Sequence, residues 1–443
     1  MTAAGRCALG LVLLLAACRR GPERPNLLLV TIDTLRADHC SAYGYGKPTT
    51  PRLEALARDG VRCELAYAPM PSTGPSHATM FTGLLPRRHG VRKNGHVLGG
   101  RHRTLAETLA RAGYRTHAIV SSFILGRRFG LDQGFASYDE SLSGSADPKE
   151  ALFQTADRAR RKAVDWLRTS GDLGSTRPAQ PFFLWVHIFD PHEPYAPPLE
   201  HRRPFAPPDE SDALRSALAS YDGEVRFADA ELGLLLDALA GAGRLDDTLV
   251  VITADHGEGL MAHGHMSHGP QLYEEAVRVP LVLRWPRGLP KGTLVEDPVL
   301  LADLQPTLLT LAGVSGTPDV DGIDLAERLR GRQRGEPNRV VLLERRQYKE
   351  RTVDGGLPVR GTLTGVRLGR FKYLEAPAEG RRELYDLLAD PGERHDLSAE
   401  RPREAESMAR LLAAWQATSG VRPELADESA ETRDALRALG YVQ

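Results

Sequence analysis

The feature that most constrains the fold is a set of continuous apolar runs spaced along the first 300 residues. They are NLLLVTI at 26–32, PFFLWVHIF at 181–189, TLVVITA at 248–254 and VPLVLRWP at 279–286. Runs without polar alternation are typical of strands buried on both faces of a parallel sheet. Helical patterns separate them, and one begins at a capping box of Thr104 and Glu107 and ends at Gly113. Strands that alternate with helices predict an α/β sheet with helices on both faces.

The pattern changes after about residue 331. Short antiparallel strands with turns and then a helix are predicted at 364–376, 381–397 and 401–417. We therefore expect a catalytic α/β domain at 26–335 and a smaller C-terminal α+β subdomain at 336–443.

The N-terminus has the pattern of an export signal. Residues 1–17 contain the single Arg6 and an apolar stretch too short to span a bilayer. The sequence LAAC at 15–18 resembles the lipobox of bacterial lipoproteins. We predict a lipoprotein signal peptide at 1–17, acylation of Cys18 as a membrane anchor, a tether at 18–25 and a location in the bacterial cell envelope. An ordinary cleaved secretory signal is the alternative.

Composition argues against one class of partner. The formal net charge is −1, and 26% of the residues are charged. A nucleic-acid-binding protein would need a strongly basic face. We therefore expect no nucleic-acid partner.

Three of the apolar runs end in residues suited to metal binding or acid–base chemistry. Asp33 follows the first run, Asp190 and His192 follow the second, and Asp255 and His256 follow the third. The carboxyl ends of strands in an open α/β sheet share one edge, where ligands bind. Asp33, Asp255 and His256 form a mixed oxygen and nitrogen set suited to a divalent cation such as Zn, Mn, Mg or Ca.

The turn STGPSH at 72–77 precedes a short apolar segment. Pro75 suits the first position of a helix, with Thr73 or Gly74 as its cap, and Gly83 would end it. The amides and dipole of such a helix start favour an anion. A hydroxyl beside a cation there is placed to lose its proton and attack an ester. A purely structural cap is the alternative for Thr73.

These segments together resemble the sulfatase family of the alkaline phosphatase superfamily over about residues 25–420. The matching motifs include PNLLLVTIDTLRAD, STGPSHATMFTGLLPRRHG, DPHEPY, TADHGEG and ELYDLLADPGE. The resemblance implies a large mixed β-sheet flanked by helices, with a smaller C-terminal α+β subdomain. It also implies an ester hydrolase whose substrate is a small molecule or a glycan or lipid ester.

The sequence departs from the family at the nucleophile. Sulfatases carry Cys-x-Pro-Ser-Arg, whose Cys becomes formylglycine, whereas this chain has Thr73 and His77 at the Cys and Arg positions. Threonine cannot become formylglycine, and a sulfated threonine cannot expel sulfate by collapsing to an aldehyde. A phosphorylated threonine can instead be hydrolysed by water. The resemblance therefore favours Thr73 as nucleophile toward phosphate or phosphonate esters, as in threonine-type phosphodiesterases.

Other roles follow from the same resemblance. Asp33, Thr73, Asp255 and His256 match metal ligands, although Thr34 replaces the second Asp of the family's first pair. The positions that would contact substrate or act in catalysis are His77, Asn94, His192 and His268.

Three alternatives remain open. Asp190, His192 and His268 form the kind of set that holds a second metal, or the histidines at 263, 265 and 268 line a solvated loop. A second alternative is a sulfuric ester hydrolase that works without formylglycine. A third is a catalytically silent lipoprotein that binds glycans. The loops at 141–149 and 197–212 are expected to shape the pocket.

Overall fold

The structure is a computed structural model that describes residues 24–147, 150–174, 180–316, 319–352, 358–418, 420–421, 423–425 and 429–439. The predicted signal peptide and Cys18 lie outside the described residues. No helix in the described ranges has the length and apolar character needed to cross a membrane. Cys40 and Cys63 are buried free thiols.

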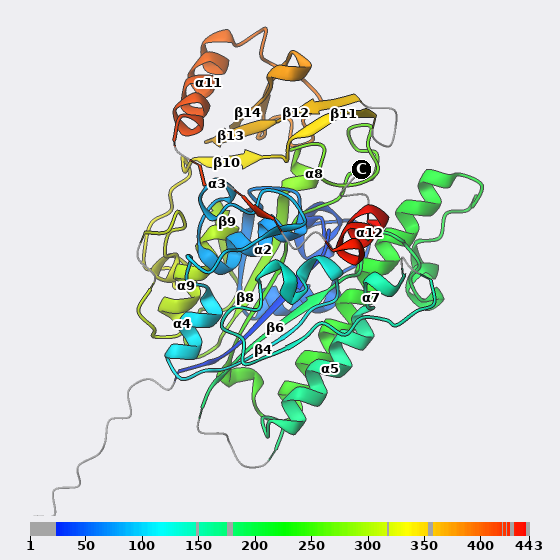
Figure 1. Ribbon diagram of the computed structural model, residues 1–443, viewed down its shortest axis with the longest axis vertical. Helices are drawn as coiled ribbons and strands as arrows, with labels where there is room; N and C mark the ends of the chain where they lie inside the picture. The colour runs from blue at the N-terminus through cyan, green and yellow to red at the C-terminus, as the bar shows by residue number, and fades with distance from the viewer. Residues whose placement is uncertain are drawn as a thin grey trace, which may run out of the picture.

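A mixed sheet of eight strands forms the centre of the larger domain (Figure 1). In spatial order the strands are β5 (Ser137–Asp139), β4 (Arg115–Ile119), β6 (Phe182–Ile188), β1 (Asn26–Ile32), β7 (Thr248–Ala254), β8 (Arg278–Arg284), β2 (Val61–Tyr67) and β9 (Thr293–Leu300). Neighbouring strands are parallel from β5 to β7, whereas β8 is antiparallel to both β7 and β2. The prediction of a large mixed sheet is confirmed.

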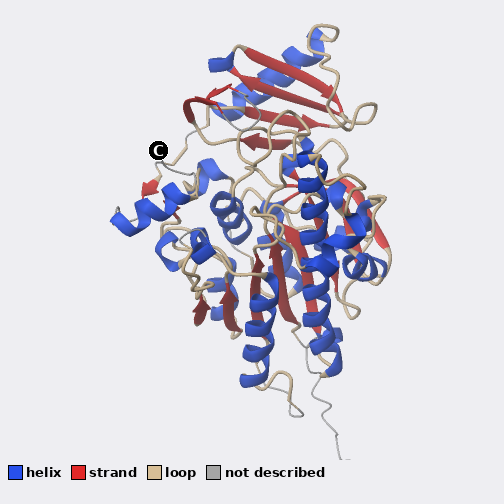
Figure 2. Cartoon of the chain, turned by 90° about the vertical axis from the view of Figure 1, so that its right-hand side faces the viewer, coloured by secondary structure: helices blue, strands red, loops and turns tan. Residues whose placement is uncertain are grey.

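Helices cover both faces of the sheet. One face carries α1 (Pro51–Arg58), α5 (Ala156–Thr169) and α7 (Ala213–Gly241), and α7 contacts both α1 and α5. The long helices α5 and α7 run side by side along the sheet (Figures 1 and 2). The other face carries α2 (Thr73–Thr82), α4 (Leu105–Arg111) and α9 (Leu304–Leu311). The capping box of α4 is present as predicted.

The three central strands bring their carboxyl ends together. Strands β6 and β7 are buried along their whole length, and β1 is buried apart from its first residue. Ile32 at the end of β1 is in register with Ile188 of β6 and with Ala254 of β7. The residues that follow these strands therefore share one edge of the sheet.

The C-terminal subdomain is built on an antiparallel sheet. Its strands are β10 (Val341–Glu344), β13 (Thr364–Leu368), β14 (Phe371–Ala376) and β15 (Arg381–Asp386), and β11 (Tyr348–Thr352) pairs with β12 (Pro358–Gly361). Helix α11 (Pro402–Gln416) packs on β13 and β14. The last described elements, β16 (Glu424–Leu425) and α12 (Ala430–Ala438), lie against the larger domain and apart from this antiparallel sheet.

A buried ion pair between Lys372 and Glu274 joins the subdomain to the larger domain, and Glu393 of the subdomain contacts the same ammonium. The fully buried Lys372 ammonium lies 3.0 Å from an oxygen of Glu274 and 2.9 Å from one of Glu393.

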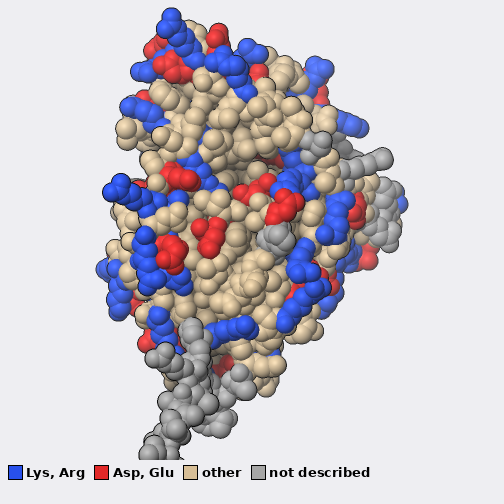
Figure 3. Space-filling view, turned by 90° about the vertical axis from the view of Figure 1, so that its left-hand side faces the viewer, with Lys and Arg blue, Asp and Glu red and all other residues tan. Residues whose placement is uncertain are grey.

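Basic and acidic side chains are interspersed on the face shown in Figure 3. The near-neutral net charge is therefore spread on this face without a broad area of one sign.

Candidate active site and metal centre

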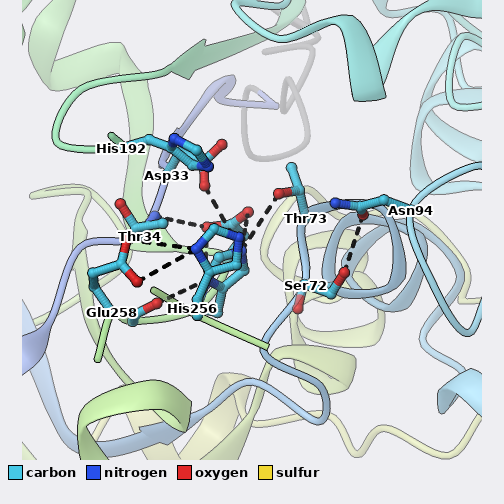
Figure 4. Close-up of polar contacts among 12 residues, drawn as sticks. Asp33, Thr34, Ser72, Thr73, Asn94, His192, His256 and Glu258 are labelled. Carbon is cyan, nitrogen blue, oxygen red and sulfur yellow. Dashed lines mark hydrogen bonds and ion pairs between the residues drawn. The ribbon is translucent and has the colours of Figure 1, made fainter. Parts of the chain in front are cut away.

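Asp33, Asp255 and His256 meet at the shared edge of β1 and β7. Figure 4 shows Asp33 and His256 facing each other there. Their ligand atoms all lie within 4.8 Å of one another. The Nε2 atom of His256 is 3.7 Å from Oδ1 of Asp33 and 3.5 Å from Oδ2 of Asp255. At most 1% of any of the three residues is exposed. The structure therefore brings together the three non-hydroxyl metal ligands that the sequence predicted.

The local backbone aims these groups inward. The backbone amides of Thr34 and His256 donate to Oδ1 of Asp255 at 3.3 and 2.9 Å, which leaves Oδ2 facing the centre. The contact between Nδ1 of His256 and the Gly257 carbonyl is 2.9 Å, so Nδ1 carries the proton and donates. The lone pair of Nε2 then points toward the two carboxylates, as in a metal-binding histidine held by a backbone carbonyl.

The carboxylates lack the partners that buried charges need. Neither oxygen of Asp33, nor Oδ2 of Asp255, has a hydrogen bond to any residue that the structure describes. Burial raises the pKa of both carboxyl groups, and the neighbouring Asp33 raises that of Asp255 further. For His256, burial lowers the pKa, but the two carboxylates raise it above its ordinary value. Unpaired buried carboxylates are costly, so this donor set fits a divalent cation.

Thr73 stands at the start of α2, beside this cluster. The helix begins two residues before Pro75, at Thr73 itself, and Ser72 occupies the cap position without a side-chain cap bond. The hydroxyl of Thr73 lies 3.4 Å from Nε2 of His256 (Figure 4). The prediction that Thr73 or Gly74 caps the helix is therefore wrong, because Ser72 takes that position and the Thr73 hydroxyl faces His256.

Asn94 lies against the same turn. Its Oδ1 atom accepts from the backbone amide of Gly74 at 2.8 Å and from the Ser72 hydroxyl at 3.1 Å. An amide N–H can only donate, so these contacts fix which end of the Asn94 amide is oxygen. Its Nδ2 is buried without a hydrogen bond to any described residue, and it faces Thr73 in Figure 4. Asn94 therefore offers an unused donor beside the Thr73 hydroxyl.

His192 and His268 lie on another side of His256. The Nδ1 atom of His192 donates to the Glu193 carbonyl at 2.6 Å, so its Nε2 is the nitrogen available to a ligand. The ring of His268 is 5.0 Å from that of His192 and 4.5 Å from that of His256, measured between centroids. Burial lowers the pKa of both His192 and His268. The structure thus gathers both predicted histidines at the site.

His77 lies behind the turn that carries Thr73. Its Nδ1 donates to the Thr73 carbonyl at 2.8 Å, and its Nε2 is 3.0 Å from the Thr31 hydroxyl. Thr31 already accepts from the Trp185 indole at 2.9 Å, so its own proton is directed at His77. Burial lowers the pKa of His77 to about 3. Both nitrogens of the neutral ring are thus engaged by the protein, and its geometry is that of a support for the start of α2.

The alternative second metal set of Asp190, His192 and His268 is not assembled, although all three residues are described. Oδ2 of Asp190 accepts from the backbone amide of Ala156, at the start of α5, at 2.7 Å. Burial and the adjacent Asp190 carboxyl raise the pKa of Glu224 to about 9, and burial raises that of Asp190 to about 6. Asp190 Oδ2 is therefore occupied by the first amide of α5, and the neighbouring Glu224 favours a protonated carboxyl. His263, the first histidine of the nearby loop, is 2.6 Å from a Glu275 oxygen and is not a solvated side chain.

Two further groups at the site were not predicted. His187 lies within the buried strand β6, where its Nδ1 accepts from the Ser121 amide at 3.3 Å and its Nε2 lies 3.4 Å from Oδ2 of Asp33. Glu258 is buried with an oxygen 3.4 Å from Nδ1 of His268, and burial raises its pKa. The sequence did contain a signal for each group. His187 is a histidine inside an otherwise apolar strand, and Glu258 is a second acid in the ADHGEG motif.

Comparisons with known proteins agree with this architecture. The family described as Sulfatase matches residues 25–314, and the family described as N-sulphoglucosamine sulphohydrolase, C-terminal, matches residues 263–416. The chain is 27% identical to an uncharacterized sulfatase, YidJ, of Escherichia coli, over 85% of this chain and 83% of that protein.

Other similar proteins differ in the ester named. The chain is 27% identical to a Delta 4,5-hexuronate-2-O-sulfatase of Bacteroides thetaiotaomicron, over 87% of each chain. The crystal structure of a phosphonate monoester hydrolase of Agrobacterium radiobacter superposes with a TM-score of 0.73 at 24% identity, covering 89% of this chain and 96% of the other.

Proposed function

This chain belongs to the sulfatase family of ester hydrolases, and from that premise we propose that it cleaves phosphate or phosphonate esters through a covalent intermediate on Thr73. The observation that carries the proposal is the Thr73 hydroxyl, 3.4 Å from His256 and beside buried carboxylates that lack partners. A threonine that carries a phosphoryl or phosphonyl group is released by attack of water, whereas a sulfated threonine lacks the exit that formylglycine provides.

The residues that would hold a divalent cation are Asp33, Asp255, His256 and Thr73, whose atoms converge at the end of β1. A bound cation would neutralise the carboxylates and favour the deprotonated form of the threonine hydroxyl. Zn, Mn, Mg and Ca all accept these donor types, so the donor set alone does not select one.

The remaining steps use groups of the chain itself. The Thr73 Oγ–P bond forms as the P–O bond to the leaving alcohol breaks. Neutral His192 or His268 takes up the proton that leaves the Thr73 hydroxyl and passes it to the departing alkoxide. The unused Nδ2 of Asn94 donates to a non-bridging oxygen as charge develops there. Water then attacks phosphorus, the Oγ–P bond breaks, and a proton returns to the threonine oxygen.

We also propose that the mature chain is anchored to the bacterial cell envelope through acylated Cys18. Support for this comes from the LAAC sequence at 15–18 and the short apolar stretch before it. Metabolic labelling with a clickable palmitate analogue tests it. Label on the full chain and none on the Cys18→Ser variant is expected, and equal labelling would contradict the anchor.

A sulfuric ester hydrolase is the second candidate. It is favoured by the names of similar proteins, since both curated relatives described above are sulfatases. In that case the sulfate ester is cleaved without formylglycine, and Thr73 is not required to carry a covalent group.

One experiment separates the candidates. The purified mature chain, supplied with Ca, Mg, Mn or Zn, is assayed on matched nitrophenyl sulfate, phosphate monoester, phosphate diester and phosphonate. Thr73→Ala tests the nucleophile. Thr82→Ala is the matched control, because Thr82 is buried in the same helix and its hydroxyl donates to the Ala78 carbonyl and accepts from the Leu84 amide, away from the metal ligands.

We expect a phosphate diester or phosphonate to be turned over fastest, with activity lost in Thr73→Ala and kept in Thr82→Ala. Preference for sulfate, or a rate retained in Thr73→Ala, would overturn the proposal. No turnover of any ester would favour a silent glycan-binding protein.

A further inference from the structure

The final described elements form a strap across the larger domain. We use the name C-terminal strap for β16 and α12 together. Strand β16 pairs antiparallel with β3 (His96–Val97), two residues after Asn94. Both family matches end at or before residue 416, so the strap lies beyond them. Figures 1 and 2 show α12 beside the larger domain and apart from the subdomain sheet.

Leu436 of α12 packs against both segments that flank the nucleophile. Its side chain belongs to an apolar cluster with Ile124 and Phe129. Its Cδ1 lies 3.0 Å from the position that a Cβ on Gly95 would take, so it covers the residue after Asn94. Ile124 in turn lies 3.8 Å from the equivalent position on Gly74. The strap is thus one side chain away from the turn that carries Thr73.

A cavity of about 580 Å³ lies between α12 and the catalytic domain. This volume is within the range of small-molecule sites. One wall is Glu431 and Ala435 of the strap. The rest of the lining includes Leu142, from the loop at 141–149 that the sequence predicted to shape the pocket, and Ala151, just after that loop. The cavity therefore has a wall that the matched family segments do not supply.

Two short chains of contacts connect the lining of the cavity to the catalytic groups. Ser122 lines it, and the preceding Ser121 donates to His187 beside Asp33. Ser122 also forms a β-bridge with Phe153, whose ring stacks on Phe189 at 4.4 Å between centroids. The Phe189 ring stacks in turn on His192 at 4.5 Å.

The charges that line the cavity are paired. Arg128 donates to the Thr432 hydroxyl at 3.1 Å and to a Glu431 oxygen at 3.5 Å, and its guanidinium lies 4.7 Å from the centroid of the Phe123 ring. An oxygen of Glu140 accepts from the Arg127 amide at 2.9 Å. A lining of apolar side chains and paired charges favours a neutral ring with apolar faces and a polar edge over a second anion.

We propose that this cavity holds the leaving-alcohol part of the substrate, a neutral ring-sized group, and that α12 forms its wall and selects among leaving groups. The inference rests on the proposed function for the identity of the reaction. It assigns to the strap a role in specificity that is separate from the attack by Thr73.

The test fills the cavity from two parts of its lining. Ala435→Trp and Ala151→Trp each place a large ring in it, and Ala438→Trp is the matched control, because Ala438 is exposed on the same helix. Each variant is assayed on two esters of the class that the wild type hydrolyses, with phenol and with 4-methylumbelliferone as leaving groups. For each ester, the KM of the variant is divided by the KM of the wild type, so that intrinsic differences between the two esters cancel.

Both filling variants should raise KM for the 4-methylumbelliferyl ester by about tenfold, the low end of what a changed apolar pocket discriminates, and should leave the phenyl ester within about threefold. The control should match the wild type on both. Equal effects on the two esters in both filling variants, or the same effect in Ala438→Trp, would overturn the proposal. If Ala435→Trp melts early because α12 detaches, Ala151→Trp still decides.

The proposed function fails separately from this inference. Wild-type turnover and its loss in Thr73→Ala test the reaction, whereas the ratio of the two esters tests the cavity. If no ester is hydrolysed, the fluorescence of 4-methylumbelliferone itself reports binding. Weaker binding by both filling variants than by the control supports the cavity assignment, and equal binding contradicts it.

Discussion

At Asn94, support of the turn at 72–77 can be separated by mutation from stabilisation of the charge that develops on the substrate. Its Oδ1 holds the Gly74 amide at 2.8 Å and the Ser72 hydroxyl at 3.1 Å, while its Nδ2 has no hydrogen bond to any described residue. Asn94→Asp keeps an acceptor for both contacts and removes the donor. Asn94→Ala removes both.

The two variants should lose activity for the same reason but differ in stability. Loss of one donor to a developing oxyanion costs about 10²- to 10³-fold in kcat, or roughly 2.7–4 kcal/mol. We expect this loss in Asn94→Ala and at least this loss in Asn94→Asp, whose carboxylate also repels the developing charge. Only Asn94→Ala leaves the buried Gly74 amide without its partner, which costs about 1–3 kcal/mol of unfolding free energy.

The assay combines steady-state kinetics on the best ester with urea denaturation of each variant. If Asn94→Asp keeps kcat within about threefold of the wild type, Nδ2 does not stabilise charge, contrary to the loss expected from such a donor. If Asn94→Ala is as stable as the wild type, the Gly74 contact contributes less than the structure indicates.

Three further predictions concern the cation, the buried acid pair and the domain junction. Divalent cation at about 100 times its Kd should raise wild-type stability by about 2.7 kcal/mol, and an equal rise in Asp255→Asn would contradict the proposed ligand set. Burial raises the pKa of Glu224 from 4.5 to about 9, so the folded chain keeps a proton that the unfolded chain releases. Wild-type unfolding free energy should therefore fall as pH rises through this window, with a shallower fall in Glu224→Gln; parallel melting profiles would refute the raised pKa of Glu224. Lys372→Met should cost about 3–5 kcal/mol in urea denaturation because it strands the carboxylates of Glu274 and Glu393, and a loss below about 1 kcal/mol would show that the pair is dispensable.

The sequence could predict the centre of the fold because its signals there are local. Strands β1 and β7 begin and end where their apolar runs do, and parallel strands place their carboxyl ends on one edge. Asp33, Asp255 and His256 follow directly from that placement. To predict that these residues converge, one needs to know only that their strands are neighbours in the sheet. The alternation of strands and helices already restricts the possible strand orders.

The failures arise where a contact between distant segments decides the outcome. Asp190 follows its strand as Asp33 does, but its Oδ2 accepts from the Ala156 amide at the start of α5 instead of facing the site. In the sequence His187 resembles any other buried residue of β6. Only the structure shows that its Nε2 lies 3.4 Å from Oδ2 of Asp33. Helix α12 has an ordinary amphipathic pattern, and nothing local shows that it lies against the larger domain.

The central claim is that Thr73 carries the transferred group, and rapid quench of the protein during turnover of its best ester, followed by peptide mass spectrometry, tests it most directly. The account predicts a phosphoryl or phosphonyl group on the peptide that contains Thr73, absent without substrate and absent in Thr73→Ala. Turnover without any adduct in the wild type, together with an unchanged rate in Thr73→Ala, would contradict it.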